Sequence, residues 1–233
     1  MYDEFLRLIR ENFDEEKELK KTAAGGIWLL RHRKSGRRYI LRRFEGSGEV
    51  YRKLLGVACP NLPRILDVAE KDGKVAILEE YVCGDTLAFL LEGGPLRPGE
   101  ARSVALQLCR GLHVLHSLDA VHRDVKPENV LLRGDEAVLI DFDASRVVKS
   151  EQRTDTVVLG TTGFAAPEQY GISQTDGRAD IYSLGVLLNI MLTGKHPSRE
   201  LAPGRMGRVV QRCTQINPKK RYKSVLYLIE DLE

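Results

Sequence analysis

The stretch HRDVKPEN at residues 122–129 decides how this chain is interpreted, together with the triplet DFD that begins at Asp141. The stretch places Asp124, Lys126 and Asn129 within six residues, and Asp141 follows twelve residues after the asparagine, behind an apolar run. Phosphoryl transfer needs a carboxylate to orient the attacking hydroxyl, oxygen ligands for Mg²⁺ and a cation to meet the charge on the transferred group. The spacing therefore predicts a phosphoryl-transfer site.

The composition is typical of a soluble globular protein. The 233 residues are 42% hydrophobic and 30% charged, and 36 basic against 33 acidic residues give a net charge of +3. Because no basic block dominates, nucleic-acid binding is not indicated. The chain begins with acidic residues where a signal peptide needs basic ones, and no run approaches the roughly 20 apolar residues of a membrane span. Four widely spaced cysteines without a CxxC pair favour reduced thiols and a cytoplasmic location.

Hydrophobic periodicity divides the chain into a β-rich first part and a helical second part. Residues 1–18 read as a short helix, and a hairpin is indicated around residues 34–36. The most apolar helix, at 181–192, should lie in the interior. We expect an α+β protein with a helical extension at 1–18, a small β-rich lobe at 19–81 and a larger helical lobe at 82–233. The expected strands cover 27–31, 38–42 and 75–78, and the expected helices cover 49–55, 86–91 and 98–117.

Three later motifs join the first stretch in one recognisable set. They are APE at residues 166–168, DIYSLG beginning at Asp180, and NPKKRY, which contains Arg221. Together they resemble the serine/threonine protein kinases of the bacterial type, from about Lys20 to the end of the chain. The resemblance implies the two-lobed kinase fold. It also implies transfer of the γ-phosphate of ATP, with Mg²⁺, to Ser or Thr hydroxyl groups of protein substrates.

The resemblance assigns roles to the residues of the catalytic loop. Asp124 would be the base that orients the acceptor hydroxyl, and Lys126 would contact the transferred phosphate. A Lys at this place favours Ser and Thr over Tyr as acceptors. Asn129 and Asp141 would hold Mg²⁺, with ATP bound between the lobes.

The resemblance also implies structural contacts in the larger lobe. His122 and Phe142 would pack on each other, and Asp180 would accept hydrogen bonds from the backbone of the catalytic loop. Glu168 and Arg221 would form a buried ion pair. Removing one partner of such a pair costs about 3–5 kcal/mol.

Several residues of the small lobe and of the segment after it would contact the nucleotide. Glu49 would be the helix acid that pairs with the nucleotide-binding cation, with Glu45 as the alternative. The backbone groups of Glu80 and Val82 would bond adenine, and Leu131 would lie beneath its ring. The remaining expected contacts are Gly25, Ile27, Ile40, Arg42, Glu79 and Asp141.

The chain departs from the family pattern around the nucleotide. Of the three glycines of the phosphate loop only Gly25 is present, and glycines there let backbone N–H groups approach phosphate. Arg42 replaces a Lys, Ile40 replaces a small Ala, and Glu79 occupies a position that is normally apolar. Asp143 replaces the Gly of the DFG motif.

Two of these departures have one explanation. Because the Arg fork can bond two carboxylates at once, we predict that Arg42 carries the cationic role and is balanced by Glu49 and Glu79. In the rival interpretation Lys20 or Lys21 supplies the cation and Arg42 is structural.

The segment from Asp141 to Glu168 is expected to regulate activity. Arg123 would receive a phosphorylated residue, and Thr154 and Thr156 are the expected acceptors. The alternative is that Arg123 pairs with a nearby carboxylate. Thr161 is expected to make a structural contact to Asp124.

Two other function classes compete with an active protein kinase. A pseudokinase would keep the fold as a nucleotide-binding or regulatory scaffold, which the poor phosphate loop and Arg42 would favour. A small-molecule kinase of the aminoglycoside type shares the Asp and the Asn but normally lacks the KPEN and APE motifs, both of which are present. The oligomeric state and the protein substrate are not indicated.

Overall fold

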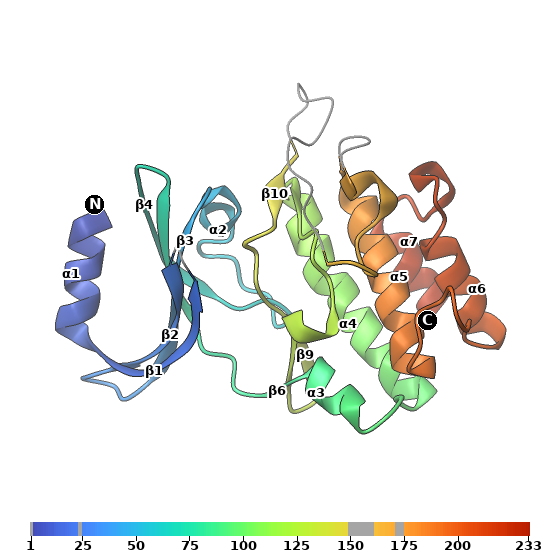
Figure 1. Ribbon diagram of the computed structural model, residues 1–233, viewed down its shortest axis with the longest axis horizontal. Helices are drawn as coiled ribbons and strands as arrows, with labels where there is room; N and C mark the ends of the chain where they lie inside the picture. Colours follow the sequence, from blue (N-terminus) through green and yellow to red (C-terminus); the bar gives the residue numbers. More distant parts are fainter. Residues whose placement is uncertain (1, 23–24, 149–160, 171–174) are drawn as a thin grey trace. The chain divides into compact units, whose positions relative to one another are not determined.

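The computed structural model describes residues 2–22, 25–148, 161–170 and 175–233 (Figure 1). The chain divides into two compact units. The β-rich unit contains Met1–Cys59 and Pro63–Val82, and the helical unit contains Pro60–Leu62 and Cys83–Glu233. No helix in these described ranges is long and apolar enough to cross a membrane. The predicted α+β class is confirmed, because the strands of the main sheet lie in the first unit and most helices lie in the second.

The β-rich unit is built on one antiparallel sheet with the strand order β1-β2-β3-β5-β4. The hairpin predicted around residues 34–36 joins β2 to β3, and the turn at Asp72 and Gly73 joins β4 to β5. The strands are β1 (Phe13–Thr22), β2 (Gly25–His32), β3 (Arg38–Glu45), β4 (Ile65–Lys71) and β5 (Lys74–Glu80), and the helices are α1 (Tyr2–Asn12) and α2 (Glu49–Lys53).

The expected helix over residues 1–18 was wrong in its second half. Helix α1 ends at Asn12, and the next residue, Phe13, begins β1, which pairs antiparallel with β2 along its length. Seven of the ten residues of β1 are charged, so the strand carries little hydrophobic periodicity. Such a composition suits an edge strand, where charge discourages pairing with another chain.

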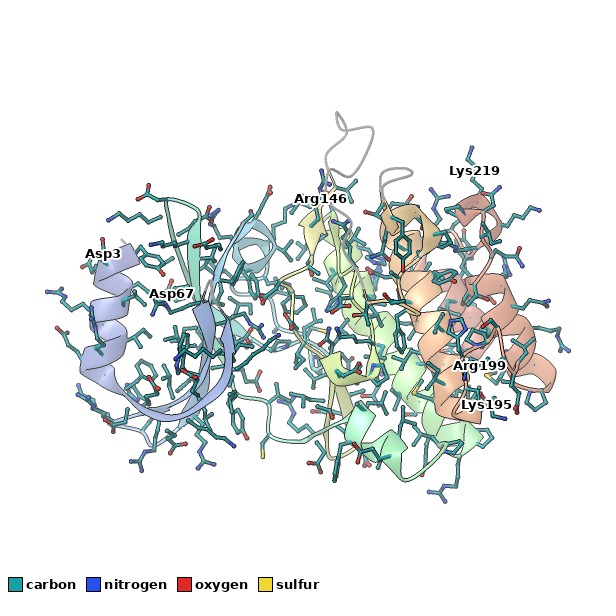
Figure 2. All side chains as sticks on the ribbon, viewed as in Figure 1. Asp3, Asp67, Arg146, Lys195, Arg199 and Lys219 are labelled. Atoms are coloured by element: carbon teal, nitrogen blue, oxygen red, sulfur yellow. The ribbon has the colours of Figure 1, made fainter. Side chains whose placement is uncertain are left out.

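Helix α1 packs on one face of the sheet and belongs to the core of the β-rich unit. Phe5 and Ile9 are buried against Leu30 and Leu41. The first turn of the helix is tied to β4 by the ion pair of Asp3 with Lys71, 2.6 Å apart (Figure 2 labels Asp3).

The opposite face of the sheet carries the unusual residues of the small lobe. Because successive side chains of a strand point to opposite faces, Ile40 and Arg42 lie on the face away from Leu41. Ile40 is paired with Glu79 of β5, which puts Glu79 on the same face as Arg42.

The helical unit is organised around α4 and α5. Helix α4 has the expected bounds, and α5 is buried on nearly all sides, as predicted for residues 181–192. A Cβ on Gly185 of α5 would lie 2.3 Å from the Cβ of Cys213, so glycine lets α5 and α6 approach closely. The helices are α3 (Leu87–Glu92), α4 (Pro98–Ser117), α5 (Gly177–Thr193), α6 (Gly204–Cys213) and α7 (Val225–Leu232).

Short strands and turns of the helical unit carry the motif residues. Asn129 ends the 3₁₀ turn η1 (Pro127–Asn129) and leads into the hairpin of β8 (Val130–Arg133) and β9 (Glu136–Leu139). Glu168 lies in the turn η2 (Pro167–Tyr170). The remaining elements are β6 (Asp85–Thr86), β7 (Ala120–Val121), β10 (Arg146–Val147) and η3 (Pro218–Lys220).

Candidate active site

Asp124 lies at the centre of a polar cluster in the helical unit. Its carboxylate oxygen Oδ1 accepts a hydrogen bond of 2.6 Å from the Thr161 hydroxyl, and its Oδ2 lies 2.7 Å from Nζ of Lys126. Lys126 Nζ also donates to the Thr161 hydroxyl at 2.8 Å. The carboxylate, the ammonium group and the hydroxyl therefore contact one another in a triangle, and Thr161 makes the contact predicted for it.

Asn129 closes the cluster from the far end of the loop. Its Nδ2 donates to both the carbonyl oxygen and the Oδ2 of Asp124, at 2.9 Å each. Burial raises the pKa of the Asp124 carboxyl, but the hydrogen bonds from Lys126, Thr161 and Asn129 outweigh burial and hold that pKa below its usual value. Asp124 is therefore ionised at neutral pH.

Asp180 fixes the backbone that leads into Asp124. Its carboxylate accepts the backbone N–H groups of His122 and Arg123, at 2.9 and 2.8 Å, and lies 2.8 Å from Nε2 of His116. Burial raises the pKa of Asp180, yet the bonds and charge of His116 and the neighbouring donors bring it below the usual value. Arg123 has a positive φ of 68°, a conformation that costs energy for a side-chain-bearing residue. The two N–H bonds to Asp180 hold the loop in that conformation.

His122 and Phe142 pack on each other edge to face, with ring centroids 5.5 Å apart. Nδ1 of His122 accepts the backbone N–H of Asp124, so the proton lies on Nε2, which donates to the carbonyl oxygen of Ile140 at 3.1 Å. Burial lowers the pKa of His122, although the carboxylates of Asp180 and its neighbours act in the opposite direction. The histidine is therefore a neutral packing residue rather than a catalytic base.

Asp141 has the positive φ of 71°, and its Oδ1 accepts the backbone N–H of Asp143 at 3.3 Å. Asn129 presents an amide oxygen, because the Nδ2 of its amide is used by Asp124. A carboxylate and an amide oxygen are the oxygen ligands that Mg²⁺ prefers, and Mg²⁺ usually combines one or two such groups with substrate phosphates. In the described part of the chain no group of three or more His, Cys, Asp or Glu residues could hold a metal by itself. The donor set fits Mg²⁺ shared with a nucleotide.

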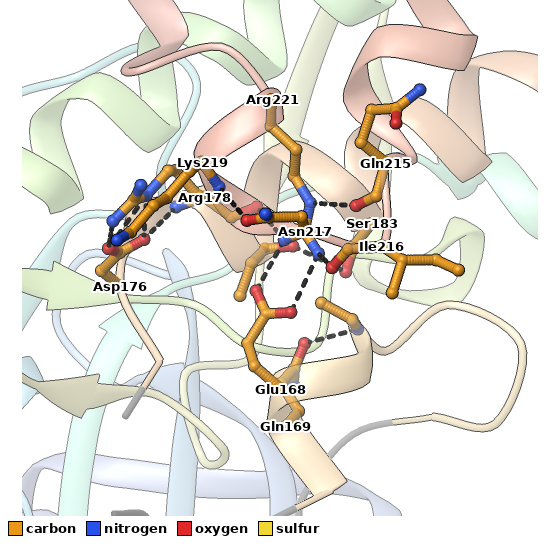
Figure 3. A network of polar contacts seen from close by, with 12 residues as sticks. Glu168, Gln169, Asp176, Arg178, Ser183, Gln215, Ile216, Asn217, Lys219 and Arg221 are labelled. Carbon is orange, nitrogen blue, oxygen red and sulfur yellow. Dashed lines mark hydrogen bonds and ion pairs between the residues drawn. The ribbon is translucent and has the colours of Figure 1, made fainter. Parts of the chain in front are cut away.

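Glu168 and Arg221 form the predicted ion pair (Figure 3). The two guanidinium nitrogens donate to the two carboxylate oxygens at 2.6 and 2.9 Å, and both side chains are buried. The other guanidinium N–H groups donate to the carbonyl oxygens of Gln215, Arg178 and Ile216. All five N–H groups of Arg221 therefore have acceptors, which is the condition under which burying such a pair is tolerable.

The β-rich unit contains a second buried ion pair. Nε and Nη2 of Arg42 both lie 3.4 Å from Oε1 of Glu79, and the two residues are 3% and 4% exposed. They occupy diagonal positions on adjacent strands, since Arg42 is paired with Ile77 and Glu79 with Ile40. The predicted contact between Arg42 and Glu79 is thus present on the face of the sheet away from α1.

Comparison with known protein sequences agrees with the motifs. The profile of the protein kinase domain family matches residues 49–226. This chain belongs to the protein kinase domain family. Within it, the domain is 35% identical over 179 residues to a serine/threonine-protein kinase of Myxococcus xanthus, covering 73% of this chain and 21% of the relative.

Two further bacterial relatives are also serine/threonine-protein kinases. The kinase domain is 42% identical over 131 residues to a serine/threonine-protein kinase of Mycobacterium tuberculosis, covering 54% of this chain and 33% of the relative. It is 28% identical over 230 residues to serine/threonine-protein kinase A of Synechocystis, covering 82% of this chain and 44% of the relative. The chain spans less than half the length of each of these three relatives.

The family match begins at Glu49, so β1, β2 and β3 of the kinase domain lie outside it. The departures Ile40 and Arg42 lie on β3, and Gly25, the one retained glycine of the phosphate loop, begins β2. Gly25 has a structural reason to be glycine, because a Cβ there would lie 2.1 Å from the carbonyl oxygen of Arg43. Its presence is explained without a phosphate contact.

The other predicted nucleotide contacts are distributed over both units. Glu49 opens α2, whereas Glu45 ends β3, so the alternative helix acid is wrong. Lys20 and Lys21 are exposed on β1, while Ile27 and Leu131 lie on β2 and β8. Glu80 ends β5 and its carboxylate accepts the backbone N–H of Arg64, and Val82 is buried just beyond the strand.

Two contacts of the kinase domain had no signal in the sequence. Gln169 follows the APE motif and donates from Nε2 to the carbonyl oxygen of Arg123 at 2.8 Å, which ties that motif to the catalytic loop. His116 holds Asp180 from the end of α4. Both join residues more than forty positions apart. The expected acceptors Thr154 and Thr156 lie outside the described residues, and Arg123 is 3% exposed.

Proposed function

We propose that this kinase domain transfers the γ-phosphate of ATP to Ser and Thr hydroxyl groups of proteins. The observation that carries the proposal is the triangle of Asp124, Lys126 and Thr161, closed by Asn129. It combines an ionised carboxylate, an ammonium group and an amide at the spacing that the reaction requires.

Asp124 orients the acceptor in this proposal. A carboxylate offers about four acceptor positions, and among the described residues Lys126, Thr161 and Asn129 use three of them. The hydroxyl of Thr161 already donates to this carboxylate at 2.6 Å, which is the bond that a substrate hydroxyl would make. The low pKa of Asp124 suits a group that positions the hydroxyl and accepts its proton late in the reaction.

Lys126 supplies positive charge beside the base. Its Nζ is fixed by two hydrogen-bond partners, Asp124 and Thr161, so the charge needs little reorganisation as the reaction proceeds. Asn129 and Asp141 would hold Mg²⁺, which when bound supplies charge neutralisation for the phosphate oxygens.

On the β-rich unit, Arg42 would carry the cationic role toward the nucleotide phosphates. Support comes from its burial beside Glu79, which holds a long side chain in one orientation. Glu49 as a second acid, and adenine contacts at Glu80, Val82 and Leu131, belong to the same proposal. Ile27 and Ile40 would contribute apolar contacts on the face that carries Arg42.

The proposal includes proteins as the substrates of the kinase. It also includes control of activity by phosphorylation of Thr154 or Thr156, with Arg123 binding the phosphorylated residue.

We also propose a cytoplasmic location, which the four cysteines support because none of them forms a disulfide in the described structure.

The proposal is tested by incubating the protein with ATP and Mg²⁺ and measuring its intact mass. Phosphate added only when Mg²⁺ is present, with the modified residues mapped to Ser or Thr, supports a protein kinase. A protein that binds ATP but adds no phosphate to itself or to a Ser/Thr-rich acceptor would favour a pseudokinase, for which the unmatched strands β1 to β3 and Arg42 are the supporting observations.

A further inference from the structure

A pocket of about 250 Å³ lies in the β-rich unit between α1 and the sheet face that α1 covers. Leu6 and Ile9 line it from α1, and Trp28 and Leu41 line it from β2 and β3. It is separate from the face that carries Arg42 and Glu79, because Arg42 and Leu41 are adjacent on β3 and point to opposite sides of the sheet. The proposed phosphoryl-transfer reaction makes no use of this pocket.

One polar group in the pocket wall has no partner of its own. Arg43 lines the pocket, and its Nε is buried without a hydrogen-bond acceptor among the described residues. Its guanidinium group lies 5.8 Å from the centre of the Trp28 ring. Leaving a buried donor unsatisfied costs about 1–3 kcal/mol, and more when the group is charged. An anion bound in the pocket would remove this cost.

The charge of the lining favours an anion. Arg10 and Arg43 contribute two positive charges, and Glu15 contributes one negative charge, which leaves one positive charge in excess. In the described structure no ion pair joins Glu15 to Arg43, so an incoming carboxylate would not have to displace an internal partner. The planar guanidinium group also matches the geometry of a carboxylate.

We propose that this pocket binds a small carboxylate with an aromatic or short aliphatic body. The body would lie among Leu6, Ile9, Trp28 and Leu41, and the carboxylate would bond Arg43. An apolar cavity of about 150 Å³ is large enough for benzene. A pocket of about 250 Å³ therefore has room for one ring and a short arm that ends in a carboxylate.

The single tryptophan of the chain provides a direct probe. Trp28 lines the pocket and is the only tryptophan in the sequence, so its fluorescence reports on this site alone. The protein is titrated with 3-phenylpropionate, which does not absorb at the excitation wavelength of tryptophan. In parallel it is titrated with the neutral 3-phenylpropanamide, which has the same shape. We expect a saturable fluorescence change with the carboxylate and at least about tenfold weaker binding of the amide.

Two variants distinguish the effect of the Arg43 guanidinium group on binding from the effect of general surface charge. Arg43→Met should lower the affinity for 3-phenylpropionate at least about tenfold and leave the amide unaffected. Arg37→Met, at an exposed position in the β2–β3 turn, should bind the carboxylate like the wild type. Circular dichroism checks that both variants are folded.

Two results would overturn the proposal. One is equal affinity for the carboxylate and the amide in the wild-type protein, a comparison that needs no variant. The other is the lack of a saturable change up to about 10 mM, a concentration at which so small a ligand should bind a matched site.

Discussion

Arg42 of β3 and Glu79 of β5 form a buried ion pair, with Nε and Nη2 of the arginine each 3.4 Å from one carboxylate oxygen. The resemblance of the sequence to the kinase family implies a lysine at the first of these positions and an apolar side chain at the second. Their contact accounts for both departures together, because a carboxylate at the second position would be unfavourable without the cation at the first.

The function of Arg42 can be separated from its structural contribution. Arg42→Met should destabilise the protein by about 3–5 kcal/mol, since it removes the guanidinium group that contacts the buried carboxylate of Glu79. The double variant Arg42→Met/Glu79→Met should recover most of that stability, because an apolar pair of similar volume replaces the ions. If Arg42 supplies the nucleotide-binding cation, the double variant should still transfer phosphate about 10²–10³-fold more slowly than the wild type.

Lys20→Ala and Lys21→Ala are the matched controls for the phosphate loop. We expect both to retain ATP binding and rate, as measured by steady-state kinetics. A stable double variant with normal kinetics, together with a strong loss in either lysine variant, would assign the cation to the loop and refute the role of Arg42.

The pair of Glu168 and Arg221 should be a large contributor to the stability of the helical unit. Glu168→Gln leaves the guanidinium group of Arg221 without its charge partner, which should cost about 3–5 kcal/mol and lower Tm by about 6–20 °C. Differential scanning calorimetry measures the change. Glu200→Gln removes the exposed pair with Lys195 and should cost less than about 1 kcal/mol. Equal effects of the two substitutions would contradict the account.

His122 should stay neutral in the folded protein well below its usual pKa. Burial lowers its pKa from 6.5, so the unfolded chain binds a proton near pH 6 that the folded chain does not bind. The free energy of unfolding should therefore fall as the pH decreases through about 6.5, with a slope of up to about 1.4 kcal/mol per pH unit from this group. Ring-nitrogen NMR shifts should show the Nε2–H tautomer at pH 6. An imidazolium signal with a midpoint of 6.5 would contradict this assignment.

Asp141 should be essential for transfer and dispensable for folding. The useful substitution is Asp141→Asn, because Asp141 has a φ of 71° and Asn tolerates that conformation better than Ala. We expect calorimetric titration to show weakened binding of Mg²⁺-ATP and kinetic assays to show almost no phosphate transfer. A variant that turned over ATP like the wild type would remove Asp141 from the metal site.

The catalytic loop was predictable because the reaction dictates both its residue types and their spacing. Asp124, Lys126 and Asn129 are close in sequence, so six residues of sequence were enough to place them together. Helix α4 was predictable for a local reason as well, since Pro98 stands at its first turn and its buried residues recur at helical spacing.

The parts of the fold and of the site that the sequence did not predict depend on contacts between residues far apart in the chain. The bonds from Gln169 to Arg123 and from His116 to Asp180 join side chains that no local pattern connects. Strand β1 was mistaken for helix because its charged residues carry no periodicity, and its pairing with β2 determines its conformation. Gly25 shows a related limit, because its close approach to Arg43 is a property of the folded sheet.

Transfer of labelled phosphate from ATP to casein, by the wild type and by Asp124→Asn, tests the central claim most directly. The asparagine keeps the shape of the side chain and removes the charge that meets Lys126 and accepts from Thr161. The account predicts Mg²⁺-dependent labelling of Ser and Thr by the wild type, abolished by EDTA, and a loss of about 10²–10⁴-fold in Asp124→Asn while ATP binding persists. Equal labelling by the two proteins, or no labelling by a wild-type protein that binds Mg²⁺-ATP, would contradict it.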